Sequence, residues 1–360
     1  MSFLVLIVAV AVSSGFRHVI REGVAAIAGD VRITPYTSGG EDPVPMPRHL
    51  PSEQAILSIP DVSAVEPAVI RAGIVKSGDI VHGVVLKGIR RPDSTLTVSI
   101  PHRLSEITGL GVGDALTTYF VGEKVRVRKF RITAIHRDLL ELDDNLLVYA
   151  NLEDLQRLNG WDSTQVSCLD VRVAAGSRRA VTEVAGHVGM LLQTGGSALE
   201  EDLYVSSSVQ AYPQVFDWLD LLDFNVLIIL ILMTVVAGFN MVSGLLIMLL
   251  RNIPLIGTLK TLGMDNRAVG RLFVRMGAEA VLKGMLIGNA LAFLFCLVQG
   301  TTHLIPLDPA NYFVAWVPVH LPVGAILAAD AAAFAGILLL LWLPTLYIAR
   351  IDPAATVKAD

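Results

Sequence analysis

The sequence has few charged residues. They make up 17% of its 360 residues, against 53% hydrophobic residues, and the mean hydropathy is +0.60. This composition is too apolar for a soluble globular protein. The excess is unevenly placed, because residues 16–222 have an ordinary polar composition and nearly everything after them is apolar. Length and composition therefore predict one domain in water and one in the membrane.

Motifs of catalytic and nucleotide-binding sites are also missing. The sequence contains no G-x-x-x-x-G-K-[ST], and so no P-loop for ATP, and it lacks G-x-S-x-G, H-E-x-x-H and C-x-x-C. The histidines are scattered between His18 and His320 without the spacing of metal ligands. We therefore expect a non-catalytic protein with no cofactor or metal of its own.

Cysteine is equally scarce. Cys168 lies in the polar part of the chain and Cys296 lies in an apolar run, so one is expected in water and the other in lipid. An intramolecular disulfide is therefore not expected. No basic stripe is interleaved with aromatic residues, which argues against nucleic acid as a partner.

Long apolar runs predict the membrane domain. Three of them, at 223–250, 272–300 and 321–348, reach or exceed the roughly 20 residues that a spanning helix needs. The N-terminal segment 1–15 has only about 11 apolar residues, or about 17 Å of helix. We interpret it as a partial first span. A cleaved signal peptide or a short anchor is the alternative.

Positive charges predict the orientation of these spans. Basic residues near helix ends stay in the cytoplasm, which places the Arg-rich segment 251–271 inside. The loop 301–320 has no Lys or Arg and is expected outside. Counting crossings then places residues 16–222 outside and the tail 349–360 inside. These assignments are consistent with one another if the chain crosses the membrane four times.

The domain at 16–222 is predicted to be α/β. Short β-branched runs bounded by Gly, Asp and Pro indicate strands at 30–36, 69–78, 80–89, 125–136, 145–150 and 168–174. Helical patterns occur at 51–59, 151–160 and 177–192. The segment 215–224 alternates apolar and acidic residues and predicts an amphipathic helix that leads into the membrane.

The segment "RNIPLIGTLKTLGMDNRAVGR" (251–271) is more elaborate than a turn between two spans requires. Pro254 suits the first turn of a helix, Gly263 suits its end, and Asp265 is a plausible N-cap of the next helix. Between them, four apolar residues recur at helical spacing and predict one apolar face: Leu255, Ile256, Leu259 and Leu262. A helix resting on the lipid surface would have such a face. A helix docked in a groove of a cytosolic partner would have it too, and we favour that interpretation.

One ionisable residue stands inside the last span. Asp330 lies a short distance into 321–348. Burying a carboxylate in lipid is costly. Two interpretations are equally consistent with its position: it lines a polar cavity, or it lies at the level of the lipid headgroups.

Taken together, the chain resembles the permease subunits of lipoprotein-releasing ABC transporters, LolC and LolE, of the wider MacB/FtsX-like superfamily. The resemblance covers essentially the whole chain. It is carried by "FNVLIILILMTVVAGFNMVSGLLIMLL", "IGTLKTLGMDNRAVGRLF", "LIPLDPANYFVAWVPV" and the tail "ARIDPAATVKAD". In the polar domain it is carried by "VSAVEPAVIRAGIVKSGDIVHGVVLKGI" and "VRKFRITAIHRDLLELDDNLLVYANLEDLQRLNGW". Family members often have an acidic residue just before the coupling helix, where this chain has Arg251.

The resemblance implies a fold, a location and a role. It implies a bacterial inner-membrane protein with four spans, the first partial, and a MacB-like periplasmic α/β domain. A coupling helix would contact a separate ATPase subunit, which binds the ATP. Its site residues would be Leu255, Ile256, Gly257, Leu259, Lys260, Leu262 and Gly263.

The resemblance also implies partners. The permease would pair with a second copy or a sister permease. It would pass lipoproteins from the membrane to a periplasmic carrier. From helix position, the interface with lipid and with the second permease is placed near Phe239, Asn240 and Met241. The alternatives are an FtsX-like signalling permease that controls cell-wall hydrolases and a MacB-like efflux or mechanotransmission permease.

Overall fold

The computed structural model describes residues 1–36, 43–77, 80–90, 95–122, 125–136, 146–174, 177–195, 197 and 200–348. The tail 349–360, predicted to be cytoplasmic, lies outside the described residues. The chain divides into two compact units. We call Met1–His18, Trp218–Leu307 and Ala315–Asp360 the helical unit. We call Val19–Asp217 with Asp308–Val314 the sheet unit.

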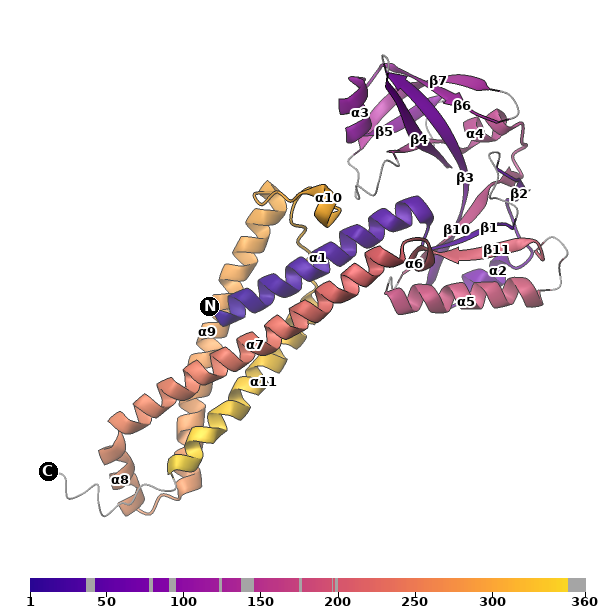
Figure 1. The fold of residues 1–360 in the computed structure, drawn as a ribbon. Coiled ribbons are helices and arrows are strands. Elements are labelled where there is room, and N and C mark those ends of the chain that lie inside the picture. Colours follow the sequence, from indigo (N-terminus) through magenta and orange to yellow (C-terminus); the bar gives the residue numbers. More distant parts are fainter. Residues whose placement is uncertain are drawn as a thin grey trace. The chain divides into compact units, whose positions relative to one another are not determined.

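The sheet unit is built on a nine-stranded sheet with the order β11-β1-β10-β3-β4-β8-β5-β7-β6 (Figure 1). Its strands are β1 (Val31–Pro35), β3 (Val62–Ser77), β4 (Ile80–Ile89), β5 (Thr97–Pro101), β6 (Ala115–Phe120), β7 (Arg126–His136), β8 (Leu146–Asn151), β10 (Cys168–Val173) and β11 (Leu203–Ser207). The short strands β2 (Met46–Pro47) and β9 (Gln165–Val166) pair separately. Most neighbours are antiparallel, but β4–β8 and β5–β7 are parallel.

The long strand β3 joins two parts of this sheet. Its first half pairs with β10, and its second half, from Val69 on, pairs with β4. β6 also pairs with β3 through Ile74 and Val75, which closes β3, β4, β8, β5, β7 and β6 into a ring of six strands. Phe120 and Phe130 meet edge to face, 6.4 Å apart, in the core of this ring. The closed ring leaves those six strands without a free edge.

Short helices cover the sheet unit. They are α2 (Glu53–Leu57), α3 (His102–Thr108), α4 (Leu152–Asn159), α5 (Arg178–Thr194), α6 (Ser208–Ala211) and α10 (Pro309–Tyr312). The caps follow the sequence, since Asn151 and Ser177 accept hydrogen bonds from the first turns of α4 and α5. Every strand and helix predicted in this region is present. The strands β2, β5, β6, β9 and β11 were not predicted.

The helical unit contains four helices long and apolar enough to span a membrane among the described residues. They belong to α1 (Ser2–Ala28), α7 (Pro213–Arg251), α9 (Asn266–Thr302) and α11 (Val323–Ile348). α1 continues without a break past residue 15, where the first span was expected to end. The predicted amphipathic helix at 215–224 and the following span form one helix, α7. The predicted fold class, four membrane helices and an α/β domain, is confirmed.

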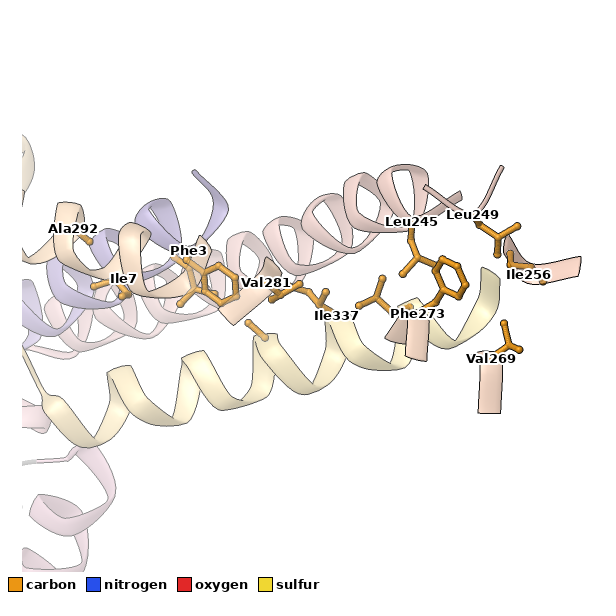
Figure 2. Close-up of a cluster of buried hydrophobic side chains, with 13 residues drawn as sticks. Phe3, Ile7, Leu245, Leu249, Ile256, Val269, Phe273, Val281, Ala292 and Ile337 are labelled. Atoms are coloured by element: carbon orange, nitrogen blue, oxygen red, sulfur yellow. The ribbon is translucent and has the colours of Figure 1, made fainter. Parts of the chain in front are cut away.

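The core of the helical unit draws on all four long helices (Figure 2). Its buried residues are Phe3, Leu6, Ile7, Leu245, Leu249, Ile256, Val269, Phe273, Val281, Ala292, Ala333, Ile337 and Leu341. Glycine permits several close approaches. A Cβ atom at Gly288 of α9 would lie 3.0 Å from the Cβ atom of Phe3, and one at Gly238 of α7 would lie 2.2 Å from Leu340. Small residues therefore set the spacing of these helices.

Candidate functional site

The short helix α8 (Ile253–Thr261) occupies the predicted cytoplasmic segment between α7 and α9. Pro254 stands in its first turn, as predicted. At its other end Gly263 has φ of +92°, and the amides of Gly263 and Met264 donate to the carbonyls of Lys260 and Leu259. This is a Schellman motif, which ends the helix at a glycine. Asp265 then occupies the N-cap position of α9, but its side chain makes no capping hydrogen bond.

One side of α8 is anchored in the helical unit. Ile256 is fully buried and belongs to the same cluster as Leu249, Val269 and Phe273 (Figure 2). Gly257 beside it is also buried. Ile256 belongs to a buried cluster with residues of both α7 and α9, so α8 is packed against both helices. Ile256 thus connects α8 to the core of the helical unit.

The other side of α8 is apolar and exposed. Leu255 is 54% exposed and Leu262 is 79% exposed, with Leu259 half-buried between them. At about 100° per residue these three leucines lie within about 60° of one another, with Gly257 roughly opposite them and Ile256 about 100° from Leu255. Of the four residues predicted to form one apolar face, Ile256 is buried in the core of the helical unit, and the other three are exposed or half-buried. We call Leu255, Leu259 and Leu262 the leucine face.

The other predicted site, Phe239 to Met241, is also divided by the structure. Phe239 is 61% exposed and Asn240 is exposed, whereas Met241 packs against the core of the helical unit. Successive residues on a helix point about 100° apart, so Phe239 and Met241 point in nearly opposite directions. Phe239 also lies about 18 Å along α7 from Arg251, where α8 follows. The structure does not bring the two predicted sites together.

Asp330 of α11 is buried at 5% exposure. Its Oδ2 accepts a hydrogen bond of 2.6 Å from Nδ2 of Asn289 in α9. The interpretation of Asp330 as a surface residue at headgroup level is therefore wrong. A buried polar pair that joins two spans is present instead.

A buried charge cluster in the sheet unit was not predicted. Asp170 accepts from Arg32 at 2.7 Å and lies 2.7 Å from Nζ of Lys87. Burial raises the pKa of the Asp170 carboxyl, but the two cations outweigh burial and hold that pKa below its usual range. The sequence does contain an indication of this cluster, because each of the three charged residues interrupts a strand that is otherwise rich in apolar, β-branched residues.

The two cations of this cluster also hold the end of α1. Lys87 donates to the carbonyl of Ala26 at 2.8 Å, and Arg32 donates to the carbonyl of Ile27 at 2.8 Å. These carbonyls have no partner within the helix because they lie in its last turn. The cluster therefore caps α1 and ties it to strands β1, β4 and β10.

The described residues contain no group of three or more His, Cys, Asp or Glu side chains arranged to hold a metal ion. Cys168 and Cys296 are both buried, and neither forms a disulfide bond. Burial raises the pKa of the Cys168 thiol to about 12.

Comparison with known proteins places the chain among membrane permeases. Residues 227–353 match the family model described as FtsX-like permease C-terminal. The chain is 24% identical to the lipoprotein-releasing system transmembrane protein LolC of Neisseria meningitidis serogroup B, over 96% of this chain and 87% of that protein. It is 28% identical to the corresponding protein LolE of Haemophilus influenzae, over 44% of this chain and 40% of that protein.

Two solved structures match about half of this chain. The periplasmic region of MacB from Actinobacillus actinomycetemcomitans matches with a TM-score of 0.32 at 12% identity, over 51% of this chain and 91% of that one. The extracellular domain of the transporter YknZ from Gram-positive bacteria matches with a TM-score of 0.31 at 10% identity, over 49% of this chain and 99% of that one.

Four long apolar helices, a helix connecting two of them and a separate α/β unit define a multi-pass permease of the inner membrane with a periplasmic domain. The comparisons support a permease similar to LolC and LolE, with a match to the FtsX-like permease C-terminal model at residues 227–353.

Proposed function

We propose that this chain is the permease subunit of an ABC transporter that extracts lipoproteins from the inner membrane for transfer toward the outer membrane. A separate ATPase subunit docks on α8 and supplies the energy. Its movement passes through α8 into the spans and from them to the periplasmic domain. The chain binds no ATP itself and works with a second permease, and a soluble periplasmic carrier receives the cargo.

The two-sided structure of α8 is the observation that carries this proposal. Leu255 and Leu262 are apolar and exposed at a helix predicted to lie in the cytoplasm, while Ile256 is fully buried. A helix that only rested on the lipid surface would need no such anchor. The anchor and the leucine face together fit a lever that receives a push from a cytosolic protein and passes it to α7 and α9.

The nature of the cargo is supported by similarity to LolC along 96% of this chain. The proposed entry for acyl chains is beside Phe239 and Asn240. Both side chains point away from the core of the helical unit. An exposed aromatic residue beside an exposed amide is suited to contact both an acyl chain and the polar group at its end.

Depletion of this protein from its host, followed by membrane fractionation over time, tests the proposal. We expect acylated lipoproteins to accumulate in the inner membrane, and a plasmid copy of the gene should restore sorting. Normal sorting with altered cell-wall cleavage would favour a signalling permease. Normal sorting with altered drug sensitivity would favour an efflux permease. Either of these results would overturn lipoprotein release as the function.

A further inference from the structure

The polar pair between Asn289 and Asp330 is incomplete. One hydrogen bond is present, from Nδ2 of Asn289 to Oδ2 of Asp330. The remaining oxygens, Oδ1 of Asn289 and Oδ1 of Asp330, are buried and have no hydrogen-bond partner among the described residues. Both atoms accept hydrogen bonds when Asp330 is ionised, so neither is able to satisfy the other. Two buried acceptors without a donor are costly in an apolar environment.

The side chains around the pair are largely apolar. One turn further along each helix, Ala292 and Ala333 belong to the apolar core. Asp330 is in no ion pair within the part of the chain that the structure describes. The long helices other than α9 are α1, α7 and α11. Their apolar stretches, residues 2–16, 224–250 and 323–342, contain no titratable side chain except Asp330.

Along α9 itself, two titratable residues flank Asn289. Lys283 and Cys296 lie six and seven residues from Asn289, or about 9 and 10 Å along the helix axis. Lys283 is exposed, and Cys296 is buried and lacks charge as a thiol. On α1, Phe3 lies against Gly288, so the amino group of Met1 is a further positive group near this level, but among the described residues it forms no ion pair with Asp330.

A single proton completes the pair. We propose that Asp330 is a proton-binding site: its Oδ1 carries a hydrogen that donates to Oδ1 of Asn289. The carboxylic acid and the amide then exchange two hydrogen bonds in a ring, and all four polar atoms are used. The neutral pair holds α9 against α11 within the membrane. This assignment is independent of the transported cargo.

The charge state of Asp330 is measurable directly on the purified, full-length protein. Infrared difference spectra between wild type and Asp330→Asn should contain the carbonyl band of a protonated carboxylic acid at neutral pH. The band should be absent from the variant and should shift in deuterium oxide. A carboxylate band in its place would overturn the proposal.

Four variants distinguish a neutral pair from a charged site through the melting temperature in detergent. Asp330→Asn should melt close to wild type, because the new amide donates to Oδ1 of Asn289 and accepts from its Nδ2. Asp330→Leu and Asn289→Leu should each melt several degrees lower, because each leaves one partner buried and unpaired. The exchange of the two residues, Asn289→Asp with Asp330→Asn, should restore the wild-type value.

Thr234→Val is the matched control, since among the described residues the Thr234 hydroxyl donates to the carbonyl of Leu230 in its own helix and bonds to no other helix. It should melt near wild type. A large loss in Asp330→Asn, as large as in Asp330→Leu, would show that the carboxylate is required. A wild-type melting temperature that rises with sodium but not with potassium would identify a cation as the ligand. Either result would overturn proton binding.

Discussion

Gly15 of α1 lies directly against the backbone carbonyl of Pro318. A Cβ atom at residue 15 would be 2.3 Å from that oxygen, which is far inside van der Waals contact. Two hydrogen bonds hold α1 at the same level. The amide of His320 donates to the carbonyl of Ala11, and the hydroxyl of Ser13 donates to Asp223 of α7. The absence of a side chain at residue 15 thus decides how closely α1 packs in the helical unit.

Gly15→Ala should destabilise the protein by about 1–3 kcal/mol, because the methyl group meets backbone rather than a side chain that can rotate away. Gly284→Ala is the matched control, since nothing lies within 4 Å of a Cβ atom there. The control should be neutral or slightly stabilising, as alanine is the better helix former. Melting temperatures in detergent measure both. Equal values for the two variants would contradict the close packing at Gly15.

The leucine face is expected to be the contact with the ATPase subunit. Leu255→Asp and Leu262→Asp should each strongly reduce ATP hydrolysis by the assembled complex, because a carboxylate cannot be buried in an apolar groove. Membrane insertion and the melting temperature of the isolated permease should stay unchanged, since both side chains are exposed. Thr261→Asp adds the same charge to an exposed residue outside the leucine face. If it impairs hydrolysis equally, the loss comes from charge and not from docking.

The buried charge cluster is expected to contribute strongly to stability. Asp170→Asn removes the one anion between Arg32 and Lys87 and should cost about 3–5 kcal/mol, because two buried cations lose their partner. The exposed pair of Glu66 and Arg172 is the control. Glu66→Gln should cost at most about 1 kcal/mol. Thermal unfolding of both variants measures the difference. If both variants lose a similar amount of stability, the buried cluster contributes no more than the exposed ion pair.

The same cluster predicts a pH dependence. Because the pKa of Asp170 is lower in the folded protein than in the unfolded chain, its contribution is complete above the unfolded value, about 3.9, and is lost as pH falls through the folded value. The gap in melting temperature between wild type and Asp170→Asn should be constant from pH 7 to about pH 5. It should narrow below about pH 4. If the difference in melting temperature does not change with pH, the charge of the Asp170 carboxylate is not its cause.

Cys168 should be inert in the folded protein. Its thiol is fully buried and its pKa is raised to about 12, so almost no thiolate exists at neutral pH. In a Cys296→Ala background, a thiol reagent should label Cys168 only after denaturation. Rapid labelling under native conditions would contradict the burial of β10. If Cys168 is labelled only after denaturation, the rate of its labelling reports how often the sheet unit opens.

Local patterns in the sequence were sufficient for the parts of this protein that depend on neighbouring residues. Hydropathy and length predicted the long membrane helices, since a bilayer requires an unbroken apolar run. Pro254 and Gly263 predicted where α8 lies, because each acts through its own backbone. The strands with β-branched runs were predicted too. The fully buried β5, with few residues and no alternation, gave no such signal.

The tertiary structure decided every question of which surfaces meet. Membrane helices are apolar on all sides, so their sequence does not show that Phe239 points outward and Met241 inward. The turn of Ile256 into the core depends on space left between α7 and α9. Asp330 finds Asn289, 41 residues away, only because α9 and α11 pack together. Partners so distant in sequence are chosen by packing, and the pattern of residues along one helix does not contain that information.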